Sequence, residues 1–270
     1  MGTVRTPAVA GAFYPGRREG LAAALAELIP AARPARPAHG VLVPHAGYVY
    51  SGAAAGRTFA EAAIPARVVL LGPNHTGRGA ALAAAPEDEW LTPLGKVAIA
   101  RDLLEKIVAA DPDVVFDGAA HRAEHCLEVQ APFLQTLRPD VALAPIVVGT
   151  NRLEPLLRLG EALAAVIAQE EDKPLVVISS DMTHYRPAAF CERQDKLALD
   201  RAAALDAEGL HKVVEERDIS MCGAAPATAA LAAFRRLGAA SGKLVVYTHS
   251  GAVTGDDREV VAYAGMVFPA

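Results

Sequence analysis

The chain has 270 residues, of which 52% are hydrophobic and 21% charged, and this composition rules out a disordered or fibrous protein. A chain of this length can bury a full hydrophobic core without disulfide bonds or a structural metal. Its formal net charge of −5 argues against nucleic-acid or anionic-membrane binding, because phosphate groups are bound by clustered Lys and Arg side chains.

Three features predict a cytoplasmic protein with no membrane segment. The N-terminal residues lack the apolar run of a signal peptide. The longest uncharged stretch late in the chain, residues 219–234, contains Gly and Pro and is shorter than the about 20 apolar residues that span a bilayer. Three scattered cysteines are too few for a disulfide framework, which fits a reducing compartment.

Short apolar, β-branched runs alternate along the chain with Ala/Leu/Glu-rich segments of helical spacing. In chain order we expect helix 21–29, strand 41–43, helix 53–62, strand 68–71, helix 102–110, strand 144–148, helix 155–169, strand 175–179, helix 228–237, and strands 244–247 and 262–267. The apolar runs have little polar alternation, so each predicts a strand buried on both faces. This order predicts an α/β fold, as a single three-layer α/β/α domain over residues 1–270 with a mostly parallel central sheet. The only proline-rich stretch, residues 31–38, lies too near the N-terminus to separate two domains.

Histidines follow three of the predicted strands at the point where each strand ends. His45 follows strand 41–43, His75 follows strand 68–71, and His184 follows strand 175–179. In open α/β sheets, ligands bind beyond the C-terminal ends of the strands. One such histidine is more often structural, but three at equivalent positions indicate a site. Two neutral imidazoles with one anionic ligand are a usual set for a transition metal that keeps open positions for substrate.

Two further side chains belong to this prediction. Asp181 and His184 suggest an acid/base pair in which Asp181 orients the imidazole. Cys222 is the candidate anionic ligand, because it shortly precedes helix 228–237 and the positive end of a helix dipole favours thiolate. The alternative for Cys222 is a small buried hydrophobic residue, which is the role we predict for Cys126 and Cys191.

A rival metal site is suggested by His121 and His125, which are spaced i and i+4, with Glu128 one turn further on. It is not the H-E-x-x-H pattern of zinc proteases, because Glu124 directly precedes the second histidine. A polar helix start with acidic residues explains the same spacing. Neither a phosphate-binding glycine loop nor the G-x-S-x-G elbow of serine hydrolases is present in the sequence.

An ordered set of motifs closely resembles the Memo family, whose prokaryotic members are called AmmeMemoRadiSam system protein B. The motifs are P-A-V-A-G-A-F-Y-P at 7–15, P-H-A-G-Y at 44–48, G-P-N-H at 72–75, T-P-L-G at 92–95, E-H-C-L-E-V-Q at 124–130, S-S-D-M-T-H at 179–184 and C-G at 222–223. The resemblance implies a fold similar to the class III (LigB-type) extradiol dioxygenases, non-haem iron enzymes with two His ligands and one Glu ligand.

The resemblance also implies a set of site residues. His45, His75 and Cys222 match the metal ligands, His184 matches the dioxygenase acid/base, and Asp181 lines the same pocket. The residues expected to line the pocket or to lie directly behind the ligands are Tyr50, Asn74, His125 and Glu128. Iron (Fe²⁺) is the expected metal, with copper or zinc as alternatives, because a thiolate is a softer ligand than a carboxylate.

Three functions follow as hypotheses. The first is a mononuclear iron or copper redox enzyme that acts on a small aromatic or redox-active substrate. The second is a non-catalytic module that binds a peptide or protein partner in a vestigial pocket. The third is a zinc hydrolase, since two His and one Cys also bind zinc. The intact ligand set with His184 beside it favours the enzyme. The family name further implies a functional link to a radical-SAM protein.

Overall fold

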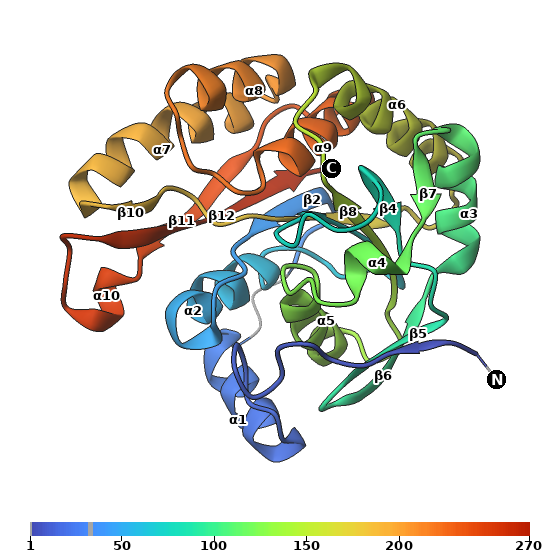
Figure 1. Cartoon of the computed structure of the whole chain (residues 1–270), viewed down its shortest axis with the longest axis horizontal. Coiled ribbons are helices and arrows are strands. Elements are labelled where there is room, and N and C mark those ends of the chain that lie inside the picture. The colour runs from blue at the N-terminus through green and yellow to red at the C-terminus, as the bar shows by residue number, and fades with distance from the viewer. Residues whose placement is uncertain (1, 32–34) are drawn as a thin grey trace.

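A computed structural model describes residues 2–31 and 35–270 of the chain. Its centre is one twelve-stranded sheet in which nine strands follow the order β1-β5-β6-β8-β3-β9-β2-β12-β10 (Figure 1). β11 pairs with β12, and β4 joins β8 to β7. The strands are β1 (Val4–Arg5), β2 (Ala38–Val43), β3 (Arg67–Pro73), β4 (Leu82–Ala84), β5 (Glu89–Thr92), β6 (Gly95–Ile99), β7 (Val114–Phe116), β8 (Ala142–Val148), β9 (Leu175–Ser179), β10 (His184–Arg186), β11 (Lys243–His249) and β12 (Val260–Pro269).

Helices cover both faces of this sheet. In Figure 1, α6, α7, α8 and α9 lie on one side of it, and α1, α2 and α5 lie on the other. The helices are α1 (Arg18–Leu28), α2 (Tyr48–Phe59), α3 (Arg101–Ala110), α4 (Gly118–His121), α5 (Ala131–Leu137), α6 (Leu153–Gln169), α7 (Ala188–Ala203), α8 (Ala207–Glu216), α9 (Ala224–Arg236) and α10 (Gly251–Thr254), with the 3₁₀ turn η1 (Glu128–Gln130). The predicted three-layer α/β/α fold with a mostly parallel sheet is therefore confirmed.

The central strands β8, β3, β9 and β2 are parallel, and their residues are almost all buried. Because helices cover both faces, each of these strands reads as a continuous apolar run rather than an alternating one. The register sets Val68 beside Leu175 and Gly40 beside Val176, so the three strands β3, β9 and β2 end at the same edge.

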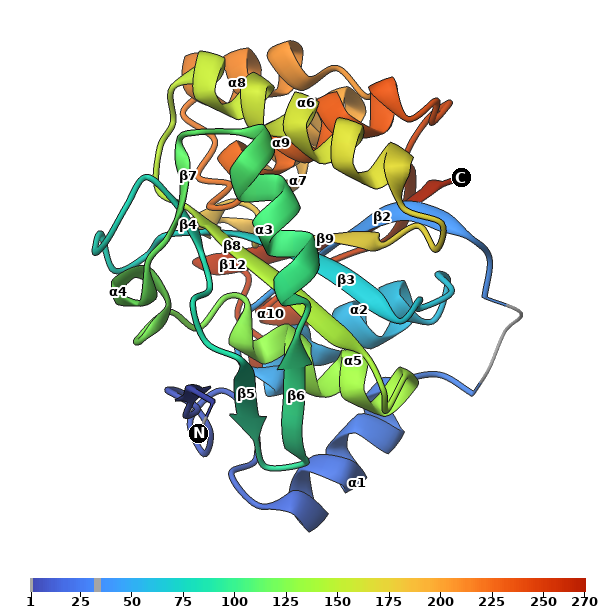
Figure 2. The same cartoon turned by 90° about the vertical axis from the view of Figure 1, so that its right-hand side faces the viewer.

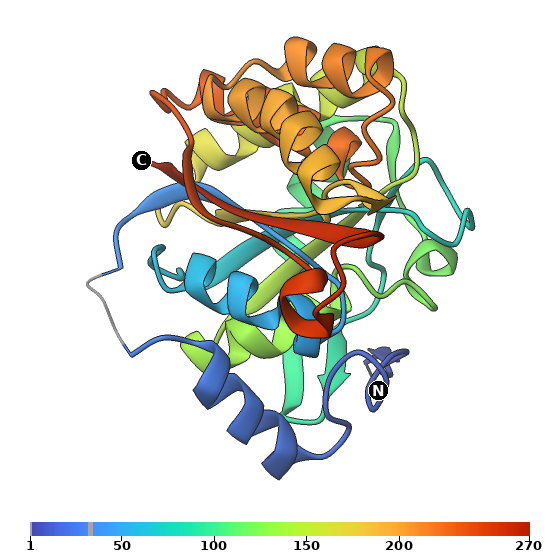
Figure 3. The same cartoon turned by 90° about the vertical axis from the view of Figure 1, so that its left-hand side faces the viewer.

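The two sides of the sheet are completed by antiparallel pairs that the sequence did not predict. The antiparallel hairpin of β5 and β6 extends from the sheet beside the N-terminus (Figure 2). β1 pairs with β5 in parallel. At the other side, β12 runs antiparallel to β2 and also pairs with β10 and β11 (Figure 3). β11 differs from the expectation of a strand buried on both faces, because Leu244 is 45% exposed. Among the described strands, β11 pairs with β12 alone and so lies at an edge.

All five predicted helices begin earlier than their sequence pattern suggests, and the two largest differences, at α2 and α9, lie at the candidate site. α2 begins at Tyr48, which is stabilised by a hydrogen bond from its hydroxyl to the Val129 carbonyl. α9 begins at Ala224, and its N-cap residue is Gly223, so Cys222 lies directly before the N-cap. Part of the proline-rich stretch, residues 32–34, lies outside the described residues. Along the described part of the chain, no helix is both long and apolar enough to cross a bilayer.

Candidate metal centre

Three loops leave the shared edge of β2, β3 and β9, and each carries a predicted site residue at the same distance from its strand. His45, His75 and Asp181 each lie two residues beyond the last residue of β2, β3 and β9, respectively. The three strands are neighbours in the sheet, so their C-terminal loops start side by side. This topology brings together residues that are far apart in the sequence.

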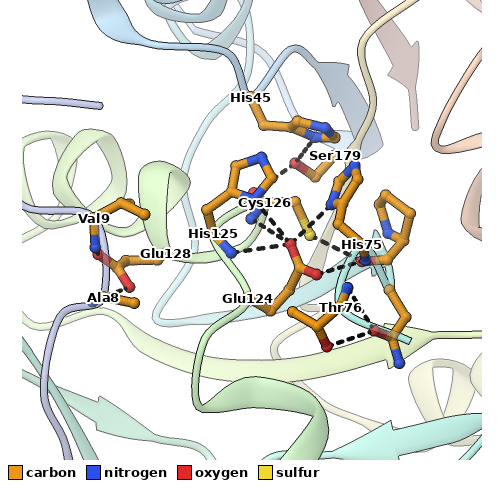
Figure 4. Close-up of polar contacts among 12 residues, drawn as sticks. Ala8, Val9, His45, His75, Thr76, Glu124, His125, Cys126, Glu128 and Ser179 are labelled. Atoms are coloured by element: carbon orange, nitrogen blue, oxygen red, sulfur yellow. Dashed lines mark hydrogen bonds and ion pairs between the residues drawn. The ribbon is translucent and has the colours of Figure 1, made fainter. Parts of the chain in front are cut away.

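His45, His75 and His125, which we call the imidazole cluster, lie close enough to share one ion. One ring nitrogen of each residue lies within 4.8 Å of one ring nitrogen of the others. The ring centroids are 5.1 Å apart for His45 and His75, 5.4 Å for His45 and His125, and 4.6 Å for His75 and His125. Figure 4 shows the three rings facing a common space. His125, predicted to lie at or behind the pocket, is therefore a full member of the cluster.

Cys222 brings a sulfur donor to the same point. Its Sγ is 3.2 Å from Nε2 of His45 and accepts a hydrogen bond from the backbone N–H of Asp181. Gly223 makes this approach possible, because a Cβ at that position would lie 2.4 Å from the Cβ of Ser180. The expected bias toward thiolate is not found. Burial raises the pKa of the Cys222 thiol, and nearby Asp181 raises it further, which outweighs the hydrogen bonds from Asp181, Ser180 and Gly223 that lower it.

The protonation of the His45 ring follows from its neighbours. Ser179 Oγ donates its proton to the Cys126 carbonyl and accepts from the Gln130 amide, so it accepts a further hydrogen bond from Nδ1–H of His45. The lone pair of His45 is therefore on Nε2, the nitrogen that faces Cys222. Burial lowers the pKa of His45 well below its ordinary value, and the neighbouring His75 and His125 lower it further, so the ring is neutral at pH 7.

Asp181 and His184 both line the cavity, but they do not form the predicted pair. Oδ1 of Asp181 accepts from the backbone N–H of His45, so this carboxyl fixes the loop that carries His45. His184 is held by Ser220 instead: its Nδ1 is 2.9 Å from the Ser220 carbonyl, and its backbone N–H donates to Ser220 Oγ. A carbonyl only accepts, so His184 carries its proton on Nδ1 and its lone pair on Nε2.

The imidazole cluster opens into a cavity of about 540 Å³. Its described lining contains His45, His75, His125, His184 and Asp181, the aromatic residues Phe13, Tyr50, Tyr185 and Tyr263, and smaller side chains, and none of these is Lys or Arg. Tyr50 is thus at the cavity, as expected, and is 42% exposed. The described lining therefore offers aromatic surface but no Lys or Arg partner for a phosphate group.

Asn74 and Glu128 have other roles than lining the cavity. The Asn74 side chain accepts hydrogen bonds from Thr76 and Gly77 and donates to the Arg78 carbonyl, so it closes the turn that follows His75. Glu128 is 1% exposed and binds Arg5, Tyr14 and the backbone of Ala8 and Val9 (Figure 4). It anchors the N-terminal segment to the loop that carries His125.

The rival pair of His121 and His125 does not form. α4 is only four residues long and ends at His121, so the two histidines do not share a helix face. His121 turns away toward the Ala83 carbonyl and the Trp90 ring. Burial lowers its pKa to about 4, which is typical of a neutral core histidine.

Glu124 is a site residue that the sequence did not single out. It binds both His75 and His125, and with His75 and Cys126 it forms a second group of donor atoms within 4.8 Å of one another. Burial raises the pKa of Glu124, but hydrogen bonds from His125 and His75 outweigh it and hold the carboxyl ionised. Cys126 is fully buried and donates to the Pro73 carbonyl, and burial raises its thiol pKa, so the predicted structural role fits it best.

Comparison with known proteins places this geometry in a family. A family model described as Memo-like protein matches residues 5–267. The chain belongs to the Memo family. The resemblance drawn from the ordered motifs is confirmed, since the match at residues 5–267 includes all of these motifs and every loop of the imidazole cluster.

Curated Memo relatives are similar over their full length. A MEMO1 family protein from Aquifex aeolicus is 42% identical over 271 residues, which cover 98% of this chain and 99% of the relative. Another from Methanopyrus kandleri is 38% identical over 278 residues, with 98% of each chain covered. A third from Methanothermobacter thermautotrophicus is 38% identical over 273 residues, with 97% of this chain and 99% of the relative covered.

Proposed function

We propose that the chain binds one metal ion through His45, His75 and Cys222 and supports redox chemistry on a small aromatic or redox-active substrate. The observation that carries this proposal is the meeting of Cys222 Sγ with Nε2 of His45, 3.2 Å apart, beside the imidazole cluster. The donors come from separate loops, and packing alone gives no reason for three imidazoles to share one cavity wall with a thiol directly behind them.

The chemistry of the donors fits a transition metal. Imidazole nitrogen suits iron, copper and zinc, and thiolate sulfur shifts the preference toward softer ions than a carboxylate would. Binding would convert the Cys222 thiol into thiolate and release its proton, as metal binding does at other cysteine sites. We propose iron as the metal, with copper as the alternative. A bound ion of this kind supplies open coordination positions and one-electron steps.

The remaining cavity residues fit roles toward substrate. His184 keeps its lone pair on Nε2 and its proton on Nδ1, which is the arrangement of a general base that accepts a proton from a substrate hydroxyl. Phe13, Tyr50 and Tyr263 provide aromatic walls against which a planar ring packs. Asp181 holds the His45 loop through the backbone and so keeps the ligand in place.

A binding module is the second candidate, and one observation favours it. Tyr50 and Tyr185 line the cavity, yet they are 42% and 73% exposed, and exposed aromatic side chains are common anchors for a protein or peptide. This function needs no metal, so the two candidates separate in a single measurement.

The deciding measurement is the metal content, by mass spectrometry, of protein purified without oxygen. We expect about one iron or copper ion per chain, lost in His45→Ala and Cys222→Ala because each removes a donor. Cys191→Ala is the matched control, since Cys191 is a buried residue of α7 whose thiol donates hydrogen bonds to backbone carbonyls outside the cluster. It should keep the metal.

Each other outcome redirects the proposal. Full metal in both His45→Ala and Cys222→Ala would refute the ligand assignment. Zinc in the wild type would point to hydrolysis, because zinc has no redox chemistry. A wild type without metal, but with an intact fold, would leave the binding module as the better function.

A further inference from the structure

We propose that Glu124 is the positioning residue of this centre: its carboxylate holds His75 and His125 with Nδ1 protonated and Nε2 directed into the cavity. The inference rests on the proposed function, because it concerns the same metal centre. It adds a residue outside the set matched by family resemblance, and it makes His125 an available fourth donor.

Glu124 lies in the loop between α4 and η1, and its side chain is 1% exposed. Oε1 is 2.9 Å from Nδ1 of His75 and 3.2 Å from Nδ1 of His125. The same oxygen accepts from the backbone N–H groups of His125 and Cys126, at 2.9 and 3.0 Å. Oε2 accepts from the backbone N–H of His75, at 2.7 Å. One buried carboxylate thus accepts four hydrogen bonds from two loops and lies within ion-pair distance of the His125 ring.

These contacts fix the position of each ring proton. An ionised carboxylate only accepts hydrogen bonds, so a ring nitrogen at hydrogen-bond distance from it must carry hydrogen. His75 therefore holds its proton on Nδ1 and keeps its lone pair on Nε2, across the ring from Glu124. The 3.2 Å approach of Glu124 Oε1 to Nδ1 of His125 favours the same form in that ring. Figure 4 shows the free nitrogens of both rings turned away from Glu124 and toward His45. Carboxylates that accept from ligating histidines orient the ring and raise its basicity in many metal sites.

Glu128 provides a built-in control for this argument. It is also 1% exposed, lies one turn further along the same segment, and likewise accepts several hydrogen bonds. Its partners are Arg5, Tyr14 and backbone N–H groups, and none is an imidazole. A merely structural role for buried carboxylates in this segment predicts the same result for both residues.

The conservative substitution Glu124→Gln changes the chemistry without changing the size. Only one orientation of the amide keeps an acceptor toward both rings, and that orientation turns the NH₂ group onto the backbone N–H of His75. The other orientation faces the NH₂ group toward both Nδ1–H groups. Either way the negative charge is lost, and the rings become free to turn or to move their protons to Nε2.

The first measurement uses the metal-free wild type, labelled with ¹⁵N in its imidazoles, at pH 8. Long-range ¹H–¹⁵N spectra report which nitrogen of each ring carries hydrogen, and His75→Gln and His125→Gln assign the two rings. We expect the Nδ1–H form for both. The Nε2–H form in either ring overturns the proposal, and this result needs no variant of Glu124 to fold.

The second measurement is Co²⁺ binding in competition with a chelator, followed by the thiolate-to-cobalt absorption. We expect Glu124→Gln to weaken binding by about 10- to 100-fold, as loss of a partner directly behind a ligand does in other sites, and Glu128→Gln to leave it within a few-fold. Equal affinity in Glu124→Gln and the wild type, or equal losses in the two variants, overturns the proposal. A wild type that binds no Co²⁺ counts against the proposed function, whereas the ring protonation still tests Glu124 on its own.

Discussion

Two polar networks meet in the segment between β7 and α5, and they differ in how much of their hydrogen-bonding capacity is used. In the N-terminal clasp, formed by Arg5, Tyr14 and Glu128, the three guanidinium nitrogens of Arg5 bind Glu128 and two backbone carbonyls. In the imidazole cluster, Nδ1 of His45 and of His75 is hydrogen-bonded and Nδ1 of His125 contacts Glu124, but within the described residues no hydrogen bond uses Nε2 of His75 or His125.

The difference separates stabilising polar groups from groups kept for a ligand. A buried polar network that is complete rigidifies the fold, whereas free lone pairs beside a cavity offer no stability and remain available to an ion. Both networks depend on the same loop, since Glu124 and Glu128 are four residues apart in the sequence. Within this loop, Glu128 belongs to a complete structural network and Glu124 contacts the imidazole cluster. Variants at the two residues should therefore affect stability and ion binding separately.

The largest expected effect is on the clasp. Arg5→Met removes the one charged partner that Glu128 has among the described residues, and this contact is 2.8 Å long and almost fully buried. It also removes a cation–π contact with Trp90. We expect a loss of about 3–5 kcal/mol in the free energy of unfolding, because an uncompensated charge is left buried. Urea unfolding measures this loss, and an unchanged free energy of unfolding would contradict the structural role of the clasp.

Tyr14→Phe should have a smaller effect of the same kind. The Tyr14 hydroxyl donates to Oε1 of Glu128 at 2.8 Å and is 3% exposed, and Phe fills the same space. The expected loss is about 1.5–3 kcal/mol, the usual range for a hydrogen bond to a charged group. The measurement is again urea unfolding, with metal binding as a parallel readout. Unchanged stability would mean that Glu128 is satisfied without this hydroxyl.

The smallest expected effect concerns pH. The pKa of His121 is lowered to about 4 by burial, below the ordinary value near 6.5, so the unfolded chain takes up this proton first as pH falls. The stability it contributes is complete above about pH 6.5 and is lost between there and about pH 4. His121→Gln should reduce the slope of unfolding free energy against pH in this window by up to about 1.4 kcal/mol per unit. An unchanged slope would show that His121 is not the group responsible.

Much of the sheet and its edge could be predicted because local patterns determine them. Apolar runs locate β2, β3 and β9, and the residues that follow these strands include His45, His75, Asp181 and, three residues further on, His184. The place of Cys222 beside them also followed from its position before α9. The short strands β1, β4 and β7 escaped prediction, since two or three residues carry no usable periodicity.

The rest of the site depends on contacts that sequence spacing does not reveal. His121 and His125 read as one helix face, but α4 ends after a single turn and the chain then crosses to the sheet edge, held there by Arg5. Glu124 was therefore taken for a helix-start residue rather than a partner of two imidazoles. The burial that raises the pKa of the Cys222 thiol is likewise a property of the folded whole, which a position before a helix does not reveal.

The equal spacing of His45, His75 and Asp181 beyond three neighbouring strands makes the site sensitive to the length of those strands. The sheet and internal hydrogen bonds hold the three loops, so the fold itself sets where these side chains lie. Side chains alternate between the two faces of a strand, so one residue inserted into β2, β3 or β9 would turn the side chain that follows it away from the other two.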